Sequence, residues 1–234
     1  MDIQFKSEMT VTLINSMASD SAVAMAARVS TVGGTHEEVV DLTKDAGLIN
    51  YLMRDRHGSP FEHNAFTFFV EAPLFVFREF QRHRMASYNE ESGRYTELKP
   101  VFYVPNEDRK LVQVGKPGAY TFVEGDYSQK MAVPASLIRN SDEAYLSYTK
   151  LLKQGVAREV ARMVLPLNIY SSMYVTMNAR SLMNFLSLRS LEQGTYPSFP
   201  QVEIADVATQ MELIFSEKMP ITHDCFVKNG RVAP

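Results

Sequence analysis

Residues 64–70 constrain the fold more than any other segment, because apolar side chains alternate on both faces of an extended chain. The two faces consist of Ala65, Thr67 and Phe69, and of Phe66, Phe68 and Val70. Such a pattern is typical of a strand that is covered on both sides. We therefore expect a buried strand at this position.

Helical and strand patterns alternate irregularly along the rest of the chain, which favours the α+β class. Further strands are predicted at residues 11–14 and 170–177. The predicted helices span residues 21–29, 35–56, 73–84, 142–154, 158–165, 179–189 and 201–218.

Capping residues mark the beginnings of several predicted helices. Ser19 or Asp20 is expected to cap the first helix, and Asn178 the helix that ends near residue 189. Thr35 and Glu38 have capping-box spacing and are expected to open the second helix.

The length of 234 residues predicts one domain or a closely fused pair of domains. Residues 99–136 are expected to form an irregular insertion or hairpin, because four prolines punctuate short strand-like pieces there. Residues 219–234 are expected to form a tail. We accordingly treat residues 1–234 as a single domain.

Charge and composition exclude several classes of protein. The formal net charge of −3 and pI near 6.0 provide no bulk attraction to nucleic acid or to an anionic membrane. The most apolar stretch, residues 65–77, is interrupted by polar residues and shorter than the roughly 20 residues of a membrane span. The N-terminal residues do not resemble a signal peptide, and the single cysteine fits a reducing compartment. A cytoplasmic protein is expected.

A cluster of basic residues within positions 78–94 stands out from this slightly acidic background. Arg78 and Arg82 are four residues apart and would share one face of the predicted helix. The guanidinium group matches the geometry of phosphate oxygens, so the cluster is a candidate anion site. A solvated helix face followed by a polar turn explains these residues equally well.

A longer pattern contains this cluster: Arg82-His83-Arg84-x-x-Ser87-x-Asn89-Glu90-x-Ser92-x-Arg94-Tyr95. It resembles, at every specified position, the signature of the flavin-dependent (alternative) thymidylate synthases. Segments 27–30, 57–63, 158–170 and 178–185 are also similar to blocks of that family, in the same order. The resemblance spans about half of the chain and leaves out residues 99–136 and the expected tail.

The resemblance implies an enzyme that methylates dUMP to dTMP. Members of this family use 5,10-methylenetetrahydrofolate as carbon donor and NADPH as reductant, through FAD. It also implies a homotetramer whose active sites combine residues of several subunits. The family fold is not a Rossmann fold, and no Gly-x-Gly-x-x-Gly follows a predicted strand here.

The resemblance further assigns residues to each ligand. The expected FAD contacts are Ser30, His57, Ser59, Glu62, Arg82, His83, Arg84, Glu90, Asn178, Arg180 and Asn184. The expected dUMP contacts are Glu79, Arg82, Glu90, Glu91, Ser92, Gly93, Arg94, Arg162 and Arg189. Glu79 stands where the family often has glutamine, so Gln81 is an alternative contact. Residues 190–200 also depart from the family, because they are longer than usual and lack a histidine.

Arg189 is the expected catalytic residue, which would stabilise the uracil ring as its N3 proton is lost. It lies on the same helical stripe as Leu182 and Phe185, where a cation needs a partner. The alternative is an arginine that reaches solvent at the end of a helix, which the helix dipole also favours.

Neither a metal site nor a cysteine nucleophile is predicted. His57, Glu62 and His63 are in the wrong order for a zinc motif, and no third ligand follows nearby. Cys225 lies in the expected tail and is interpreted as an ordinary thiol. No base is evident that would activate Ser92 as a nucleophile, so flavin chemistry is expected instead.

Three other functions fit parts of the sequence. A flavin- and folate-dependent methyltransferase acting on RNA uracil would need a basic surface, which the net charge disfavours. A nucleotide-binding regulator without turnover would keep the arginines, and a purely structural homotetramer would not need the complete motif.

Overall fold

The computed structural model describes residues 2–33 and 42–234 and divides them into two compact units. The first unit contains residues 2–9, 71–80 and 90–173. The second contains the described parts of 10–70, together with 81–89 and 174–234. The expectation of a single domain stays a prediction.

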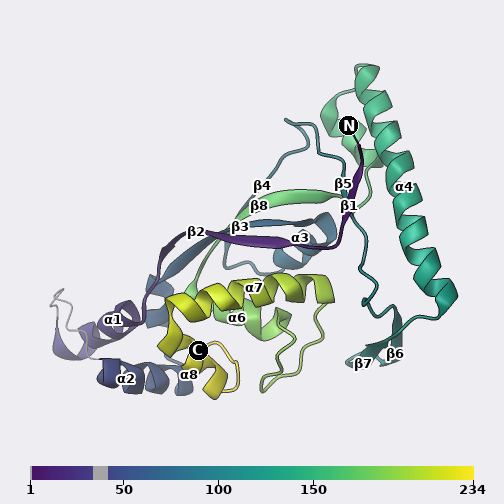
Figure 1. Cartoon of the computed structure of the whole chain (residues 1–234). Helices are drawn as coiled ribbons and strands as arrows, with labels where there is room; N and C mark the ends of the chain where they lie inside the picture. The colour runs from purple at the N-terminus through teal and green to yellow at the C-terminus, as the bar shows by residue number, and fades with distance from the viewer. Residues whose placement is uncertain (1, 34–41) are drawn as a thin grey trace. The chain divides into compact units, whose positions relative to one another are not determined.

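Most of a four-stranded sheet belongs to the second unit (Figure 1). Its strands, in spatial order, are β2 (Thr10–Met17), β3 (Ala65–Pro73), β8 (Tyr170–Asn178) and β4 (Ser87–Glu90). The three predicted strands are therefore confirmed, and so is the α+β class. The buried face of β3 consists of Phe66, Phe68 and Val70, whereas the alternate residues 65, 67 and 69 are half-buried. One face of the strand is thus buried as expected, whereas the other face is only partly covered.

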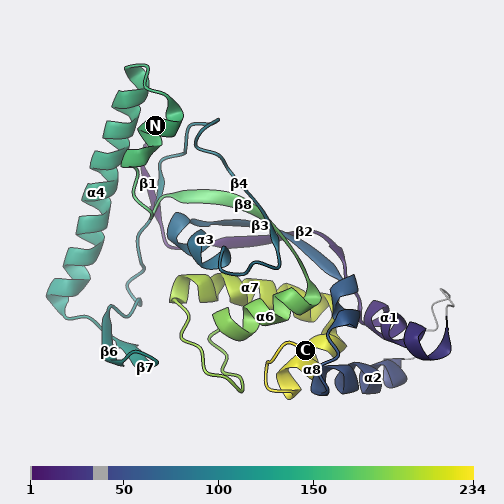
Figure 2. The same ribbon diagram turned by 180° about the vertical axis from the view of Figure 1, so that it is seen from behind.

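The helices of the second unit gather around this sheet and around one another. They are α1 (Asp20–Val32), α2 (Leu42–Arg54), the 3-10 helix η1 (Ser59–His63), α6 (Ala179–Arg189), α7 (Val202–Lys218) and α8 (Pro220–Lys228). Helix α7 packs on β2, α6 and α8, and α6 and α7 run side by side in both views (Figures 1 and 2). The ring of Phe215 on α7 meets that of Phe66 edge-to-face at 6.0 Å, which joins helix and sheet in one core.

Two of the predicted caps are confirmed. The Ser19 hydroxyl accepts a hydrogen bond from the backbone N–H of Ala22 at 3.1 Å, at the beginning of α1. The Asn178 side chain caps α6 in the same way. Thr35 and Glu38, the predicted capping box of the second helix, lie outside the described residues.

The first unit combines short strands with one long helix. Strand β1 (Gln4–Lys6) pairs in parallel with β5 (Val101–Tyr103), and β6 (Val112–Lys116) forms an antiparallel hairpin with β7 (Ala119–Val123). The helices are α3 (Leu74–Phe80), α4 (Tyr127–Lys153), α5 (Arg158–Ala161) and the 3-10 helix η2 (Arg162–Val164). Its core contains the buried rings of Phe102, Tyr145 and Tyr148.

Residues 99–136 were expected to form an irregular insertion or hairpin, and they contain the hairpin of β6 and β7. The long helix that follows begins earlier than predicted. Helix α4 begins at Tyr127 rather than near residue 142, and it contains Pro134. A capping box of Asp126 and Gln129 starts this helix, with hydrogen bonds of 2.8 and 2.9 Å. The proline was interpreted as a break, yet the capped turns before it and the packed turns after it keep the helix continuous.

The predicted helix at residues 73–84 is shorter than expected. Helix α3 ends at Phe80, and Pro73 belongs to strand β3. The Tyr88 hydroxyl donates to the backbone carbonyl of His83 at 2.6 Å, in the turn that leads to β4. Arg78 and Arg82 therefore do not share a helix face, which corrects the sequence-based interpretation.

The segment expected to be a tail also contains regular structure. Residues 220–228 form helix α8, and Cys225 is buried within it. Among the described residues, no helix has both the length and the apolar character needed to cross a bilayer.

Candidate active site

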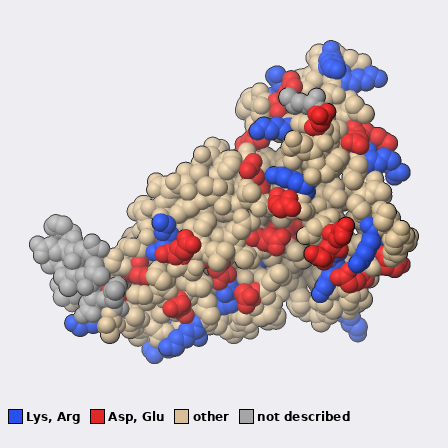
Figure 3. Space-filling model, viewed as in Figure 1, with Lys and Arg blue, Asp and Glu red and all other residues tan. Residues whose placement is uncertain are grey.

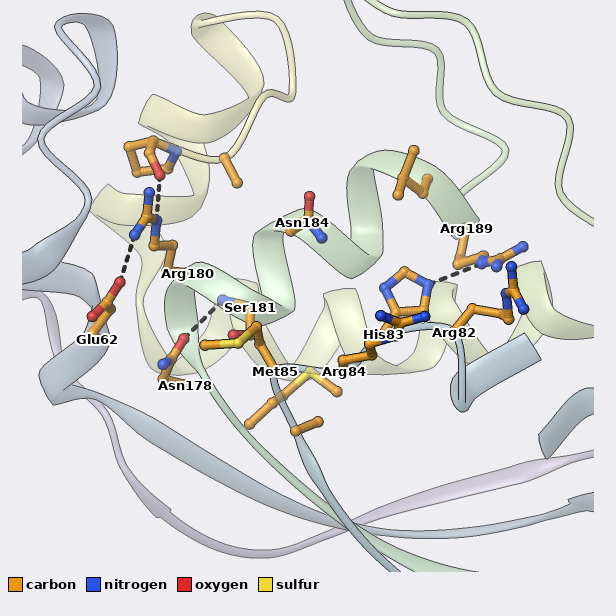
Figure 4. Close-up of a pocket in the computed structure, with 15 residues that line it drawn as sticks. Glu62, Arg82, His83, Arg84, Met85, Asn178, Arg180, Ser181, Asn184 and Arg189 are labelled. Atoms are coloured by element: carbon orange, nitrogen blue, oxygen red, sulfur yellow. Dashed lines mark hydrogen bonds and ion pairs between the residues drawn. The ribbon is translucent and has the colours of Figure 1, made fainter. Parts of the chain in front are cut away.

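A cavity of about 490 Å³ lies within the second unit, where the turn after α3 faces helix α6 (Figure 4). Its walls come from the Arg-His-Arg run and the two residues after it, from the end of β8, from α6, and from the last residues of the chain. The lining residues are Glu62, Arg82, His83, Arg84, Met85, Ala86, Met177, Asn178, Arg180, Ser181, Asn184, Leu188, Arg189, Ala233 and Pro234.

Helix α6 presents one face to the core and another to this cavity. Leu182, Phe185 and Leu186 are fully buried, whereas Arg180 and Asn184 are exposed and line the cavity. The Asn178 side chain accepts from Ser181 N–H at 2.8 Å and fixes the first turn. The helical period therefore places the polar residues of this segment on one wall.

Arg189 pairs with His83 instead of reaching freely into solvent. Its Nε donates to the His83 Nε2 at 3.0 Å, as the dashed line in Figure 4 shows. The imidazole also meets the ring of Phe185 at 4.9 Å between centroids. The predicted apolar stripe on α6 is thus confirmed, and the cation on it has a neutral partner.

The surroundings of His83 determine its protonation state. Burial, and secondarily the charge of Arg189, lower the pKa of His83 from 6.5 to about 4. The imidazole is therefore neutral at neutral pH. Because Nε2 accepts the hydrogen bond, the geometry assigns the ring proton to Nδ1.

The cavity carries an excess of positive charge. Arg82, Arg84, Arg180 and Arg189 line it, and Glu62 is the acidic residue among the lining side chains. Arg180 pairs with Glu62 at 2.5 Å and also donates its Nε to the backbone oxygen of Pro234 at 2.5 Å. Guanidinium groups suit phosphate oxygens, while Met85, Met177 and Leu188 add apolar surface. This donor set fits a cofactor that has both phosphate groups and an apolar ring.

A second group of predicted site residues lies in the first unit, around the residue that ends β4. The Ser171 hydroxyl donates to the Glu90 carboxylate at 3.3 Å. Burial raises the pKa of Glu90, although Ser171 and the charge of Arg162 oppose this shift. Glu90 is therefore a carboxyl group that is easier to protonate than a solvated one.

The loop after Glu90 turns tightly. The backbone oxygen of Ser92 accepts from the N–H groups of Tyr95 and Thr96 at 2.9 and 3.1 Å. A side chain at the buried Gly93 would lie only 3.2 Å from the Arg162 Cδ, so glycine allows Arg162 to approach the loop. Arg94 is exposed and pairs with Glu159 at 3.2 Å.

Four other predicted residues lie outside the set that lines the cavity. Ser30 is exposed on α1, His57 stacks on Tyr51 at 5.5 Å between ring centroids, and Ser59 is an exposed residue of η1. Glu79 is half-buried on α3 in the first unit.

The cavity also includes residues that the sequence patterns do not mark. Ala233 and Pro234 belong to the segment expected to be a tail, and Arg56 holds that segment through backbone carbonyls. Neither spacing nor residue type could have identified these contacts, because they depend on tertiary structure alone.

Comparisons with known proteins identify the family of the chain. The family model described as thymidylate synthase complementing protein matches residues 12–221. A flavin-dependent thymidylate synthase of Streptomyces coelicolor is 57% identical over 99% of this chain and 96% of its own. One of Thermotoga neapolitana is 44% identical, over 93% of this chain and 90% of its own.

Solved structures extend the similarity to three dimensions. The UMP/dUMP methylase PolB of Streptomyces cacaoi, bound with 5-Br dUMP, has a TM-score of 0.94 and 50% identity, over 99% of this chain and 100% of its own. The same enzyme bound with 5-Br UMP has a TM-score of 0.91. The fold and these relatives identify the chain as a methyltransferase. The chain belongs to the flavin-dependent thymidylate synthase family.

Proposed function

We propose that this protein methylates dUMP to dTMP, with 5,10-methylenetetrahydrofolate as carbon donor and NADPH as reductant through FAD. The observation that carries the proposal is the cavity that joins the Arg-His-Arg run to Asn178, Arg180, Asn184 and Arg189. Segments about a hundred residues apart in sequence meet there, and both belong to the family blocks. The nucleotide analogues bound to the related PolB support a uridylate substrate.

The cavity residues would hold the cofactor. Arg82, Arg84 and Arg180 offer donors for its phosphate groups, with Asn178 and Asn184 beside them on the capped helix. His57, Ser59, Glu62, Ser30 and Glu90 are further proposed contacts. When bound, FAD would carry electrons from NADPH to the transferred carbon, which is chemistry that no side chain supplies.

Arg189 would stabilise the uracil ring. Loss of the N3 proton leaves negative charge on the ring oxygens, and a guanidinium fixed beside them lowers the free energy of that state. The neutral His83 accepts a hydrogen bond from the Arg189 Nε, which fixes the orientation of the guanidinium group.

The loop after Glu90 would bind the nucleotide. Glu91, Ser92, Gly93 and Arg94 form its turn, and Arg162 approaches it beside Gly93. The exposed carboxylate of Glu159 is the partner of Arg94, and a substrate phosphate would replace it with a stronger charge-assisted hydrogen bond. Glu79 remains a proposed contact of the nucleotide.

The reaction would proceed without a cysteine nucleophile. Cys225 is buried in α8, and burial raises the pKa of its thiol. A reactive cysteine needs the opposite shift, because the thiolate is the nucleophile. Cys225 is also outside the residues that line the cavity.

A basic surface for a polynucleotide is not evident on the face shown in Figure 3. Lysine and arginine side chains are interspersed there with aspartate and glutamate. Together with the net charge of −3, this favours a free nucleotide over RNA as substrate.

A steady-state omission series tests the proposal. The purified protein is incubated with dUMP, 5,10-methylenetetrahydrofolate, FAD and NADPH, and dTMP is measured by mass spectrometry. We expect product in the complete mixture and none when either the carbon donor or NADPH is left out. Product that forms without NADPH would contradict the proposed reductant.

UMP is a second candidate substrate. PolB, which is 50% identical to this chain, is described as a UMP/dUMP methylase. The same assay with UMP in place of dUMP compares the two values of kcat/KM and assigns the preferred acceptor.

A further inference from the structure

The residues after α8 form a wall of the cavity, although the family model ends before them at residue 221. Gly230 and Arg231 both have positive φ angles, of 79° and 55°, which turn the chain sharply at the end of the helix. The backbone N–H of Arg231 donates to Phe226 at 2.9 Å. This turn directs residues 232–234 toward the cavity.

A buried ion pair anchors the turn. The Arg231 guanidinium donates both terminal nitrogens to the Glu212 carboxylate, at 2.7 and 2.6 Å. The two side chains are 7% and 14% exposed, so little solvent weakens the pair. Residues 232–234 therefore begin from a fixed point on helix α7.

Two arginines then hold the backbone of these three residues. The Arg56 Nη1 donates to the carbonyl oxygens of Val232 and Ala233, at 2.9 and 3.2 Å. Arg180 donates its Nε to the oxygen of Pro234 and its Nη1 to Glu62, and Figure 4 shows the contact with Glu62. The Arg180 guanidinium is thus fixed from two sides, and its remaining N–H groups can donate to a ligand.

Gly58 completes this junction. A Cβ at position 58 would lie 2.5 Å from the Arg180 Cζ and Nε, and 2.8 Å from the Pro234 oxygen. The φ angle of Gly58 is −78°, which any residue adopts, so close approach explains the glycine and backbone strain does not.

We propose that residues 232–234, held by Arg56, position the Arg180 guanidinium for an anionic part of the cofactor. Arg56 and residues 232–234 are positioning residues, because they act through Arg180. A guanidinium that is already oriented loses less conformational freedom when the ligand binds, which raises affinity. This inference rests on the proposed flavin-dependent function.

The test measures FAD affinity rather than turnover. The dissociation constant of FAD is measured by flavin fluorescence for the wild-type apoprotein and for Arg56→Ala. We expect about tenfold weaker binding in the variant, the effect of losing one hydrogen-bonded support of a charged group. Arg54→Ala is the matched control, because Arg54 is exposed two residues away and pairs with Asp55. It should bind FAD like the wild type.

A second variant perturbs the same junction from the other side. Gly58→Ala introduces the clash with Arg180 and Pro234, whereas Gly47→Ala adds a methyl group with no atom within 4 Å. We expect weaker FAD binding in Gly58→Ala alone. Thermal unfolding checks that both variants fold.

The outcomes separate this inference from the proposed function. Wild-type affinity in both Arg56→Ala and Gly58→Ala would overturn the inference and leave the function intact. A wild-type protein that binds no FAD would overturn both.

Discussion

The contact between His83 and Arg189 links a sequence motif to a chemical role at the scale of single residues. Because the pKa of His83 is lowered from 6.5 to about 4, the unfolded chain binds more protons than the folded one between these values. The stability that neutral His83 contributes is complete above pH 6.5 and is lost as the pH falls toward 4.

Replacement of His83 therefore changes the pH dependence of stability. Between about pH 7.5 and pH 5, the free energy of unfolding of His83→Gln should fall less than that of the wild type, because the variant lacks this titration. Chemical unfolding at both pH values measures it, with the exposed His63→Gln as control. An equal loss in wild type and His83→Gln would contradict the assigned protonation state.

Arg189→Ala tests the catalytic assignment directly. We expect kcat to fall about a hundredfold or more, because a fixed cation at a developing negative charge is lost. The dissociation constant of dUMP should rise far less, since other residues bind the phosphate. Arg139→Ala, an exposed substitution on α4, should leave both constants unchanged. Near-normal turnover in Arg189→Ala would exclude the proposed role.

The residues of the motif were predictable because the resemblance gives their order and the α6 periodicity gives their face. The partner of Arg189 was not. His83 lies 106 positions away in sequence, and no local pattern couples the two side chains. The same holds for Arg180 and Pro234, which only the folded second unit brings together.

At the scale of elements, helix α8 shows what a pattern-based interpretation misses. Apolar residues and a proline at the first position, here Pro220, are features of many short helices. The segment was nevertheless interpreted as a tail. Its position depends on Glu212 of α7, which accepts hydrogen bonds from His223 and Arg231. Burial by itself would raise the pKa of Glu212. The hydrogen bonds and the charges of the two partners outweigh burial and lower the pKa to about 2.

Glu212→Gln should therefore destabilise the second unit. Removing the charge leaves the buried Arg231 without an ionic partner, which costs about 3 kcal/mol in the free energy of unfolding. The stability due to the Glu212 charge is present above pH 4.5 and decreases toward pH 2, so the difference between wild type and variant should shrink on acidification. Glu217→Gln, exposed on the same helix, is the control. Equal denaturation midpoints at neutral pH would contradict the prediction.

At the scale of the whole molecule, the α+β class was predictable because strand and helix periodicities differ along the chain. The start of α4 was not, because Pro134 was interpreted as part of an irregular segment, whereas the helix begins before it at the capping box of Asp126 and Gln129. The division into two compact units was not predictable either, since each unit contains three separate stretches of sequence.

The proposed assembly is a homotetramer. Light scattering of the FAD-loaded protein should give four times the chain mass of 26.5 kDa. A particle of one chain mass that retains full activity would contradict active sites shared between subunits.

The most direct measurement of the central claim is an anaerobic single turnover. The FAD-loaded protein is reduced with NADPH, separated from excess reductant, and mixed with dUMP and 5,10-methylenetetrahydrofolate. The account predicts dTMP in an amount that matches the reduced flavin, with the same yield for Cys225→Ser. Reduced flavin that gives no dTMP, or a yield that is lost in a folded Cys225→Ser variant, would contradict it.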